Sequence, residues 1–346
     1  MLAEILLSIA IVISFVLFVN KFVSFKSLTL LLTILTLCVV VLGAYVRLSD
    51  AGLGCPDWPG CYGTLTVPQS ADALSDAHAI YPDSPVEHAK AWKEMVHRYL
   101  AGILGLFVLA LFVQAWHERK SIKVTPWLPT ALLGIVGIQA MLGMWTVTML
   151  LQPAIVTMHL MGGMTTLAIL TWITHRHWGV SSANFLLLGK TRLFVRLAIL
   201  VLIGQIFLGG WTSTNYAALA CTDFPTCHGE WIPTMDFANA FHWFRELGEN
   251  LEGEPLGLSA YVAIQWIHRV GALITFIYLG LLGLRLMKQA QLRGFASIML
   301  ILLIVQIGLG IANLLLYLPT VLAVGHNMVA AMLLMTVIMI NSKITE

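Results

Sequence analysis

Charged residues are scarce in this 346-residue chain. Asp, Glu, Lys and Arg make up 10% of it, whereas hydrophobic residues make up 59%. A soluble domain carries about 25% charged residues, so the composition excludes an ordinary soluble globular fold. The formal net charge is only +2 and no basic arm is present, so nothing in the charge pattern points to nucleic acid as a partner.

Cysteine is also rare, with five residues in the chain. Four of them form two C-x5-C pairs, Cys55 with Cys61 and Cys221 with Cys227, while Cys38 stands alone in an apolar run. The sequence contains no C-x-x-C-H, which argues against covalent c-type heme attachment. In an oxidising compartment the pairs predict two short-loop disulfides, with Cys-His zinc ligation as the weaker alternative. Cys38 is expected to be a small buried apolar residue.

Long apolar runs fill most of the chain. Each is about 20 residues long, enough to cross a bilayer as a helix, and their length and period are not those of membrane β-barrel strands. The first run lacks a basic start and a clear cleavage site, so we expect a retained helix rather than a signal peptide. We therefore predict an all-α integral membrane protein with nine spans, at about 3–20, 27–47, 91–116, 127–149, 153–175, 193–213, 261–285, 295–317 and 320–341.

The distribution of Lys and Arg predicts how the spans are oriented. Two long loops, about 48–90 and 214–260, are acidic, and most of the basic residues lie in or next to the loops of the other side. These basic residues are Lys21, Lys26, Arg119, Lys120, Lys123, Arg176, Lys190, Arg192, Arg196, Arg285, Lys288, Arg293 and Lys343. Because cytoplasmic loops carry the excess of positive charge, we expect the basic side and the carboxyl terminus to be cytoplasmic.

The chain contains an internal repeat. GAYVRLSDAGLGCPDWPGCYG (43–63) aligns without a gap with GGWTSTNYAALACTDFPTCHG (209–229), and His159 aligns with His326. We predict two pseudo-symmetric four-helix transmembrane bundles, 27–178 and 190–342. Because each has an even number of spans, they are parallel repeats. The segment 1–26 has no counterpart and is expected to form one extra N-terminal transmembrane helix.

Four histidines lie within the predicted spans at matched depth. His97 and His159 each lie about six residues into a span, which is about 9 Å below the outer surface at 1.5 Å per residue. His268 and His326 repeat this arrangement in the second unit. Intramembrane polar residues are usually functional, and two facing His favour a heme with both axial positions filled. A bare zinc ion would need three or four ligands, and a simple interhelical hydrogen bond is the structural alternative.

Two arginines and one glutamate accompany these histidines. Arg98 and Arg269 directly follow the first His of each unit, where they could bind heme propionates or, instead, loop carbonyls or lipid phosphate. Glu94 lies three residues before His97, and its counterpart in the second unit is the uncharged Gln265. This difference predicts chemistry in the first unit and a permanent cofactor in the second. A carboxylate that merely favours the helix dipole is the alternative for Glu94.

Glutamines recur in a QxxxG pattern. Gln139 and Gln306 occupy corresponding positions, where they could cross-link helices or bond a ligand. The pattern also occurs at 205–209, where we expect no nearby His. We therefore expect a packing role for these glutamines.

With these motifs the chain resembles the heme A synthase family. The resemblance covers about 27–342 and rests on GAYVRLSDAGLGCPDWPGCYG, EMVHR, IVTMHLMGG, IQWIHR and VGHNMVAAM. It implies that the carboxyl-terminal bundle holds heme b through His268 and His326. It also implies that the amino-terminal bundle binds the substrate heme o with His97 and His159 as ligands, and that Glu94 is essential.

The resemblance also implies an activity and a location. Members of the family are oxidoreductases that oxidise a ring methyl of heme o to a formyl group through a hydroxymethyl stage, giving heme A for cytochrome c oxidase. The cysteine pairs match the bacterial form with disulfides Cys55–Cys61 and Cys221–Cys227. We expect an inner-membrane protein with heme sites near the periplasmic side, contacting lipid, heme o synthase and an electron-transfer partner.

Two other functions fit parts of the pattern. A two-heme b-type cytochrome that exchanges electrons with quinol would bind heme in both bundles, yet it would need no Glu94/Gln265 difference. A transporter built from parallel repeats would favour broken helices and polar residues near the midplane, which the sequence does not indicate.

Overall fold

The computed structural model describes residues 2–179, 190–250 and 252–344, and this part of the chain contains helices and no strands. Within these ranges, eight helices are long and apolar enough to cross a membrane. They are α2 (Phe25–Leu48), α4 (His88–His117), α5 (Trp127–Thr148), α6 (Pro153–Trp178), α7 (Lys190–Thr214), α9 (Leu258–Leu286), α10 (Arg293–Leu315) and α11 (Thr320–Lys343). The all-helical membrane architecture is thus confirmed.

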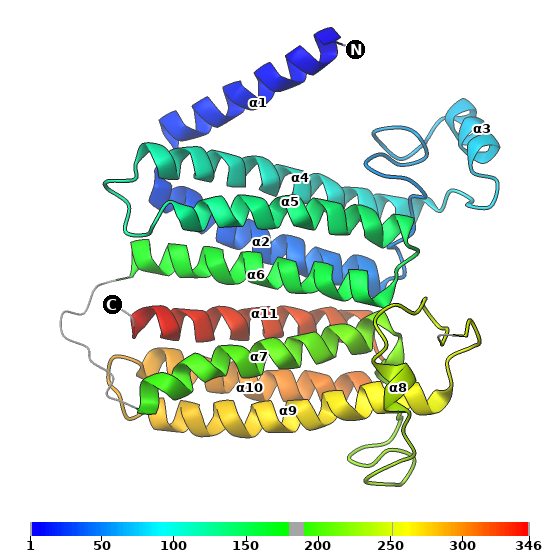
Figure 1. The fold of residues 1–346 in the computed structure, drawn as a ribbon, viewed down its shortest axis with the longest axis vertical. Helices are drawn as coiled ribbons and strands as arrows, with labels where there is room; N and C mark the ends of the chain where they lie inside the picture. Colours follow the sequence, from blue (N-terminus) through cyan, green and yellow to red (C-terminus); the bar gives the residue numbers. More distant parts are fainter. Residues whose placement is uncertain (1, 180–189, 251, 345–346) are drawn as a thin grey trace.

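The predicted ninth span corresponds to α1 (Leu2–Phe22). The part of it whose side chains are described, Leu6–Phe22, is shorter than the eight candidate spans, whereas the whole helix has 21 residues and about 20 are needed to cross the hydrocarbon layer. α1 packs against α4 and lies at the edge of the molecule (Figure 1). The extra N-terminal span therefore stays a prediction, and Met1 lies outside the described residues.

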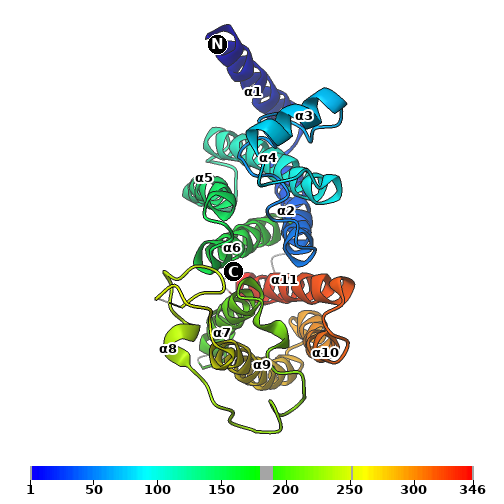
Figure 2. The same ribbon diagram turned by 90° about the vertical axis from the view of Figure 1, so that its right-hand side faces the viewer.

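The spanning helices pack in two groups that follow each other along the chain. In the first group α2 and α5 each contact both α4 and α6, and in the second α7 and α10 each contact both α9 and α11. The groups meet where α6 contacts α7 and α11 and where α2 contacts α11. Figure 2 shows the helices nearly end-on, with α2 and α6 next to α11 and α7.

Local sequence explains where several of these helices begin. The Ser24 hydroxyl accepts a hydrogen bond from the Ser27 N–H at 3.2 Å, and so caps α2. Pro153 occupies the first turn of α6, where its missing N–H would have no intrahelical partner. Inside α2 the Thr33 and Thr36 hydroxyls bond carbonyls one turn earlier, which satisfies these polar groups within the bundle.

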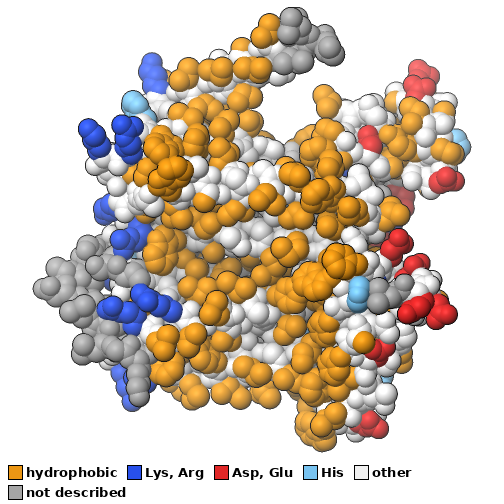
Figure 3. Space-filling model, viewed as in Figure 1, with side chains coloured by type: hydrophobic (Ala, Val, Ile, Leu, Met, Phe, Trp, Pro, Cys, Tyr) orange, Lys and Arg blue, Asp and Glu red, His pale blue; other side chains and the backbone are white. Residues whose placement is uncertain are grey.

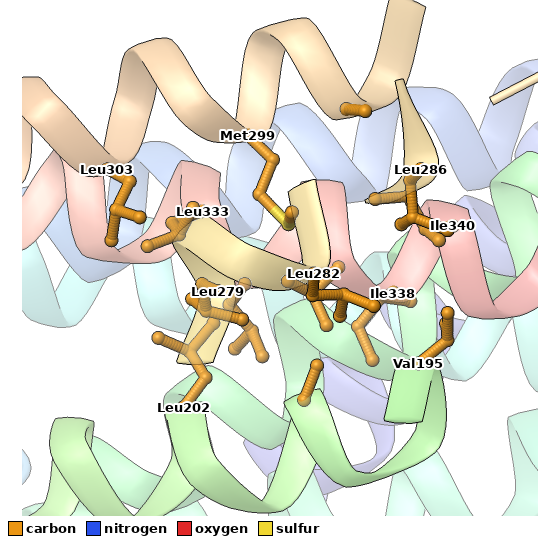
Figure 4. Close-up of a cluster of buried hydrophobic side chains, with 14 of the residues drawn as sticks. Val195, Leu202, Leu279, Leu282, Leu286, Met299, Leu303, Leu333, Ile338 and Ile340 are labelled. Atoms are coloured by element: carbon orange, nitrogen blue, oxygen red, sulfur yellow. The ribbon is translucent and has the colours of Figure 1, made fainter. Parts of the chain in front are cut away.

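Apolar side chains fill the centre of the second helix group. Leu279, Leu282 and Leu286 of α9 meet Met299 and Leu303 of α10 (Figure 4). A separate cluster fills the first group and includes side chains of α1. The lone cysteine does not take part, because Cys38 is exposed on α2, so the prediction of a buried Cys38 is wrong. An apolar side chain in a membrane gains little by facing protein rather than lipid.

Charge separates between the two ends of the molecule. Lys and Arg gather at one end and Asp and Glu at the other (Figure 3). The acidic end carries the two long loops, which contain α3 (Ala71–Ile80) in the first and η1 (Ala217–Leu219) and α8 (Phe237–Ala240) in the second. We call this the outer end.

Each long outer loop contains a disulfide hairpin, which we define as residues 55–67 in the first loop and 221–233 in the second. Disulfides join Cys55 to Cys61 and Cys221 to Cys227, as the spacing predicts. The second cysteine of each pair forms an isolated antiparallel bridge three residues on, to Thr64 and to Glu230 respectively. Both hairpins also contain one cis peptide bond, before Pro59 and before Pro225.

An aspartate organises each hairpin from within. Asp57 accepts hydrogen bonds from the N–H groups of Tyr62 at 2.6 Å and Gly63 at 2.8 Å. Asp223 likewise accepts from the N–H groups of His228 at 2.7 Å and Gly229 at 3.0 Å, and from the Thr226 hydroxyl at 2.6 Å. The Thr226 hydroxyl and these N–H groups hold the pKa of the Asp223 carboxyl well below its usual range, because they stabilise its charged form.

Candidate functional site

Four glycines make room for the four intramembrane histidines. In the first group, a Cβ added at Gly43 of α2 would lie 3.0 Å from Cε1 of His97 on α4. A Cβ added at Gly143 of α5 would lie 3.5 Å from Cε1 of His159 on α6. Each imidazole therefore lies directly against the backbone of the neighbouring helix.

The second group has the same arrangement. A Cβ added at Gly209 of α7 would lie 3.1 Å from Cε1 of His268, and one added at Gly310 of α10 would lie 3.2 Å from Cε1 of His326. Contacts as short as these are tighter than ordinary van der Waals packing, so a side chain at these glycines would displace the ring. Sequence reasoning missed this role, although Gly43 and Gly209 stand at corresponding positions of the repeat.

The structure brings the histidines together in two pairs. His97 lies within electrostatic range of His159, and His268 within range of His326. Among the described residues no group of three or more His, Cys, Asp or Glu could hold a metal ion. A closed zinc site would need such a group, whereas a heme needs only two axial ligands from the protein.

Three of the four histidines have a ring nitrogen that is free to bond a ligand such as heme iron. The Nδ1 atoms of His97, His159 and His326 are buried and have no hydrogen-bond partner within the described part of the chain. Buried polar atoms are nearly always paired. These orphaned nitrogens fit a heme whose iron would take up one nitrogen and so fix the tautomer of each ring.

Glutamines contact the histidines of the second group. Gln205 Nε2 lies 3.0 Å from His268 Nδ1 and 3.2 Å from the His268 carbonyl oxygen. Gln306 Nε2 lies 3.1 Å from His326 Nε2. The expectation that the glutamine at 205 has no nearby His is thus wrong, because α7 and α9 lie side by side although these residues are 63 positions apart. Val39 stands at the corresponding position of the first group, so His97 has no equivalent glutamine partner.

Glu94 is buried beneath the first hairpin, and its side chain is held by two donors. Oε2 accepts from the Cys55 N–H at 2.9 Å, and Oε1 accepts from the Arg98 guanidinium at 2.5 Å. Glu94 is 5% exposed. The carboxyl group therefore lies against a guanidinium one helical turn further along α4, in a place that water hardly reaches.

Gln265 occupies the matching place beneath the second hairpin. Its Oε1 accepts from the Cys221 N–H, and its Nε2 donates to the Ala218 carbonyl at 2.5 Å. Like Glu94, Gln265 is 5% exposed. The two side chains thus anchor the first cysteine of each hairpin in the same way, and they differ mainly in charge.

The two arginines at the sites reach loop carbonyls. Arg98 donates to the Asp57 carbonyl at 2.9 Å and to the Gly60 carbonyl, besides its ion pair with Glu94. Arg269 donates to the carbonyls of Asp223, Thr226 and Cys221 at 2.9, 2.8 and 2.8 Å. Of the alternatives that the sequence left open, bonding to loop carbonyls is the one observed. Propionate binding by Arg98 and Arg269 stays a prediction.

The fold and the paired histidines define a class of protein: an all-helical membrane protein with two intramembrane two-histidine sites, each next to a disulfide hairpin. Within that class, residues 26–338 match the family described as cytochrome oxidase assembly protein, COX15-CtaA. The chain belongs to this family.

Named relatives point to the same group. The chain is 44% identical over 310 residues to a protein named Heme A synthase from Shewanella oneidensis, covering 89% of this chain and 93% of the relative. It is 29% identical over 337 residues to Heme A synthase from Methylobacterium radiotolerans, covering 90% and 87% of the two chains. A third relative of that name, from Rhizorhabdus wittichii, is 26% identical over 326 residues.

Proposed function

We propose that this protein is a heme A synthase, an oxidoreductase that converts a ring methyl of heme o to a formyl group through a hydroxymethyl stage. The observation that carries the proposal is the difference between two otherwise matching sites. The first has the buried Glu94 carboxylate three residues from His97, whereas the second has the neutral Gln265 three residues from His268. The 44% identity to a named Heme A synthase over most of both chains supports it.

We assign the two sites to separate pseudo-symmetric bundles, 27–178 and 190–342. Contacts between corresponding residues of the two halves support this division. Arg47 donates to the Ser213 carbonyl at 2.7 Å, 166 positions away, and His175 Nδ1 lies 3.0 Å from Ser342 Oγ, 167 positions away. A two-fold relation makes corresponding residues meet where its axis passes, and these contacts lie at opposite ends of the interface between the helix groups.

In this assignment the second bundle holds a resident heme b through His268 and His326. Gln205 and Gln306 support a permanent site once their amides are turned by 180°, because each Oε1, now buried without a partner, would then accept from the ring N–H of a ligating imidazole and fix its orientation. Bound there, heme b would supply electron transfer to or from the reacting site. Gly209 and Gly310 would leave room for the two rings to turn toward the iron.

The first bundle binds the substrate, heme o, between His97 and His159. Its own residues then position the reacting methyl and manage protons. The Glu94 carboxylate can accept a proton at Oε1 or Oε2 or stabilise positive charge that develops at the carbon being oxidised. Arg98 holds that carboxylate in place through its 2.5 Å contact, and the hairpin above it excludes water.

We further propose that both sites lie near the periplasmic face of a bacterial inner membrane, with the carboxyl terminus in the cytoplasm. The gathering of Lys and Arg at one end of the molecule supports this orientation (Figure 3). Heme o is most simply delivered by heme o synthase, and an electron-transfer partner is needed to balance the oxidation.

Coexpression with a heme o synthase tests the proposed function. Pigments extracted from the purified protein and its membranes should contain heme A, identified by mass and by the absorption of its formyl group. A two-heme electron carrier would yield heme b and unchanged heme o instead, and that result would overturn the proposal.

A further inference from the structure

Each disulfide hairpin carries exposed apolar side chains shortly after its second cysteine, and we call these residues the tip of the hairpin. Leu65 is 79% exposed in the first, and Trp231 and Ile232 are 71% and 73% exposed in the second. Single exposed apolar residues are common on protein surfaces. Large apolar side chains exposed at corresponding places of two cross-linked hairpins call for a partner surface.

Hydrogen bonds attach these tips to the sides of two spanning helices. The Tyr99 hydroxyl of α4 donates to the Leu65 carbonyl at 2.6 Å, and Trp266 Nε1 of α9 donates to the Trp231 carbonyl at 2.9 Å. Tyr99 and Trp266 each lie two residues from the first site histidine of their helix. Because two residues span about 3 Å of helix, each tip is tethered at nearly the depth of a candidate site.

The direction of the hairpins agrees with this depth. Figure 1 shows the second hairpin, in yellow-green, lying beside the outer end of α9 rather than extending beyond it, and the first lying beside α4. In Figure 3 hydrophobic side chains are visible near the acidic end of the molecule, at its upper and lower edges. The tips therefore lie next to the membrane-facing sides of these helices.

We propose that the two hairpin tips insert into the outer leaflet of the bilayer, at the boundary between headgroups and acyl chains. The helix beside the second tip, α9, also exposes apolar side chains further along, with Leu273 and Ile274 59% and 57% exposed. Tryptophan favours this boundary because its ring is apolar and its N–H is polar. Glu230, next to the second tip, is exposed and keeps that hairpin from sinking into the hydrocarbon.

This contact would link the membrane to the candidate sites. The first hairpin is bonded to Glu94 and Arg98, and the second to Gln265 and Arg269. A tip held in the outer leaflet therefore helps to fix the loop that covers each histidine pair. The inference does not depend on which reaction the protein performs.

Nitroxide labels at the tips test the insertion. In the full-length Cys38→Ala protein, whose other cysteines are disulfide-bonded, Ile232→Cys and Leu65→Cys each provide one reactive thiol. The labelled proteins are reconstituted into phosphatidylcholine–phosphatidylglycerol vesicles. Relaxation of the nitroxide by O2, which concentrates in the bilayer, is compared with relaxation by water-soluble Ni(II)EDDA.

Two matched sites calibrate the measurement: Leu273→Cys on the lipid-facing side of α9 and Ala79→Cys on the exposed helix α3. We expect labels at 232 and 65 to favour O2 over Ni(II)EDDA several-fold more than the label at 79 does, approaching the label at 273. Labels at both tips that behave like the one at 79 would overturn the proposal, and would leave these tips as surfaces for a water-borne partner.

Discussion

Replacing Glu94 by glutamine should abolish the reaction without unfolding the protein. The second half of the chain already has a glutamine, Gln265, at the corresponding position. Gln265 bonds the first cysteine of its hairpin just as Glu94 does, and its neighbour Arg269 donates to the Cys221 carbonyl at 2.8 Å. In Glu94→Gln the Cys55 N–H keeps an acceptor, and Arg98 can turn to the Cys55 carbonyl in the same way. We therefore expect a folded protein that still binds heme.

The expected loss of stability is small. A hydrogen bond to a charged group contributes about 1.5–3 kcal/mol, and the Glu94–Arg98 contact at 2.5 Å is the one that disappears. Because Arg98 gains a carbonyl in exchange, we expect a net loss of about 1.5 kcal/mol or less. Glu94→Ala is the harsher change, since it leaves the buried Cys55 N–H without an acceptor and a largely buried guanidinium without its counter-charge, and should cost about 3–5 kcal/mol.

The effect on activity should be large by comparison. A positioned acid or base typically contributes about 10²- to 10⁴-fold, so formyl production in Glu94→Gln should fall at least about 100-fold. The assay is pigment extraction after coexpression with heme o synthase, alongside the heme content and thermal midpoint of the purified variant. Gln265→Glu is the matched control and should still make heme A.

One result would refute this reasoning. If Glu94→Gln makes heme A at the wild-type rate while binding heme normally, Glu94 is a hairpin anchor and nothing more, as Gln265 is. The chemistry would then have to be assigned to other groups in the first bundle.

Three further changes test other parts of the account. Gly209→Val should displace the His268 ring and lower the amount of heme bound per protein. Gly204→Val, on the same helix, is the control and should not lower it, because a Cβ added at Gly204 would meet nothing within 4 Å. Gln205→Leu should weaken heme b binding about 10- to 100-fold, as the loss of an outer hydrogen bond to a ligating histidine does, and a heme titration measures it. Asp223 has a lowered pKa, so its contribution to stability is present above the ordinary titration range of Asp and is lost as pH falls through the folded-state pKa. Thermal midpoints of wild type and Asp223→Asn should therefore differ at pH 7 and at pH 5, and should converge only in stronger acid.

The sequence predicts the membrane fold well because the signal is strong and local. Runs of apolar residues about as long as a bilayer is thick mark helices almost regardless of context. The pairing of histidines followed from their repeated spacing within those runs. The exposure of Cys38 was not predictable in this way, since apolar residues in a membrane helix face protein or lipid with similar ease.

Contacts between distant segments were the part that sequence reasoning could not supply. Gln205 reaches His268 only because α7 lies beside α9, and no local pattern indicates that neighbour. The carbonyls that bind Arg98 and Arg269 belong to hairpins whose path over the helices depends on three-dimensional packing. A signal for the histidine-facing glycines was present, since Gly43 and Gly209 align in the repeat, but glycine is too common in membrane helices for this to be decisive.

The most direct test of the central claim is the amount of bound heme in variants of each histidine pair, measured on purified protein by its absorption as a pyridine complex. We expect heme b to remain when His97 and His159 are both changed to alanine, and to be lost when His268 and His326 are both changed. A wild-type protein that takes up no heme, or one that keeps its full heme b without His268 and His326, would contradict it.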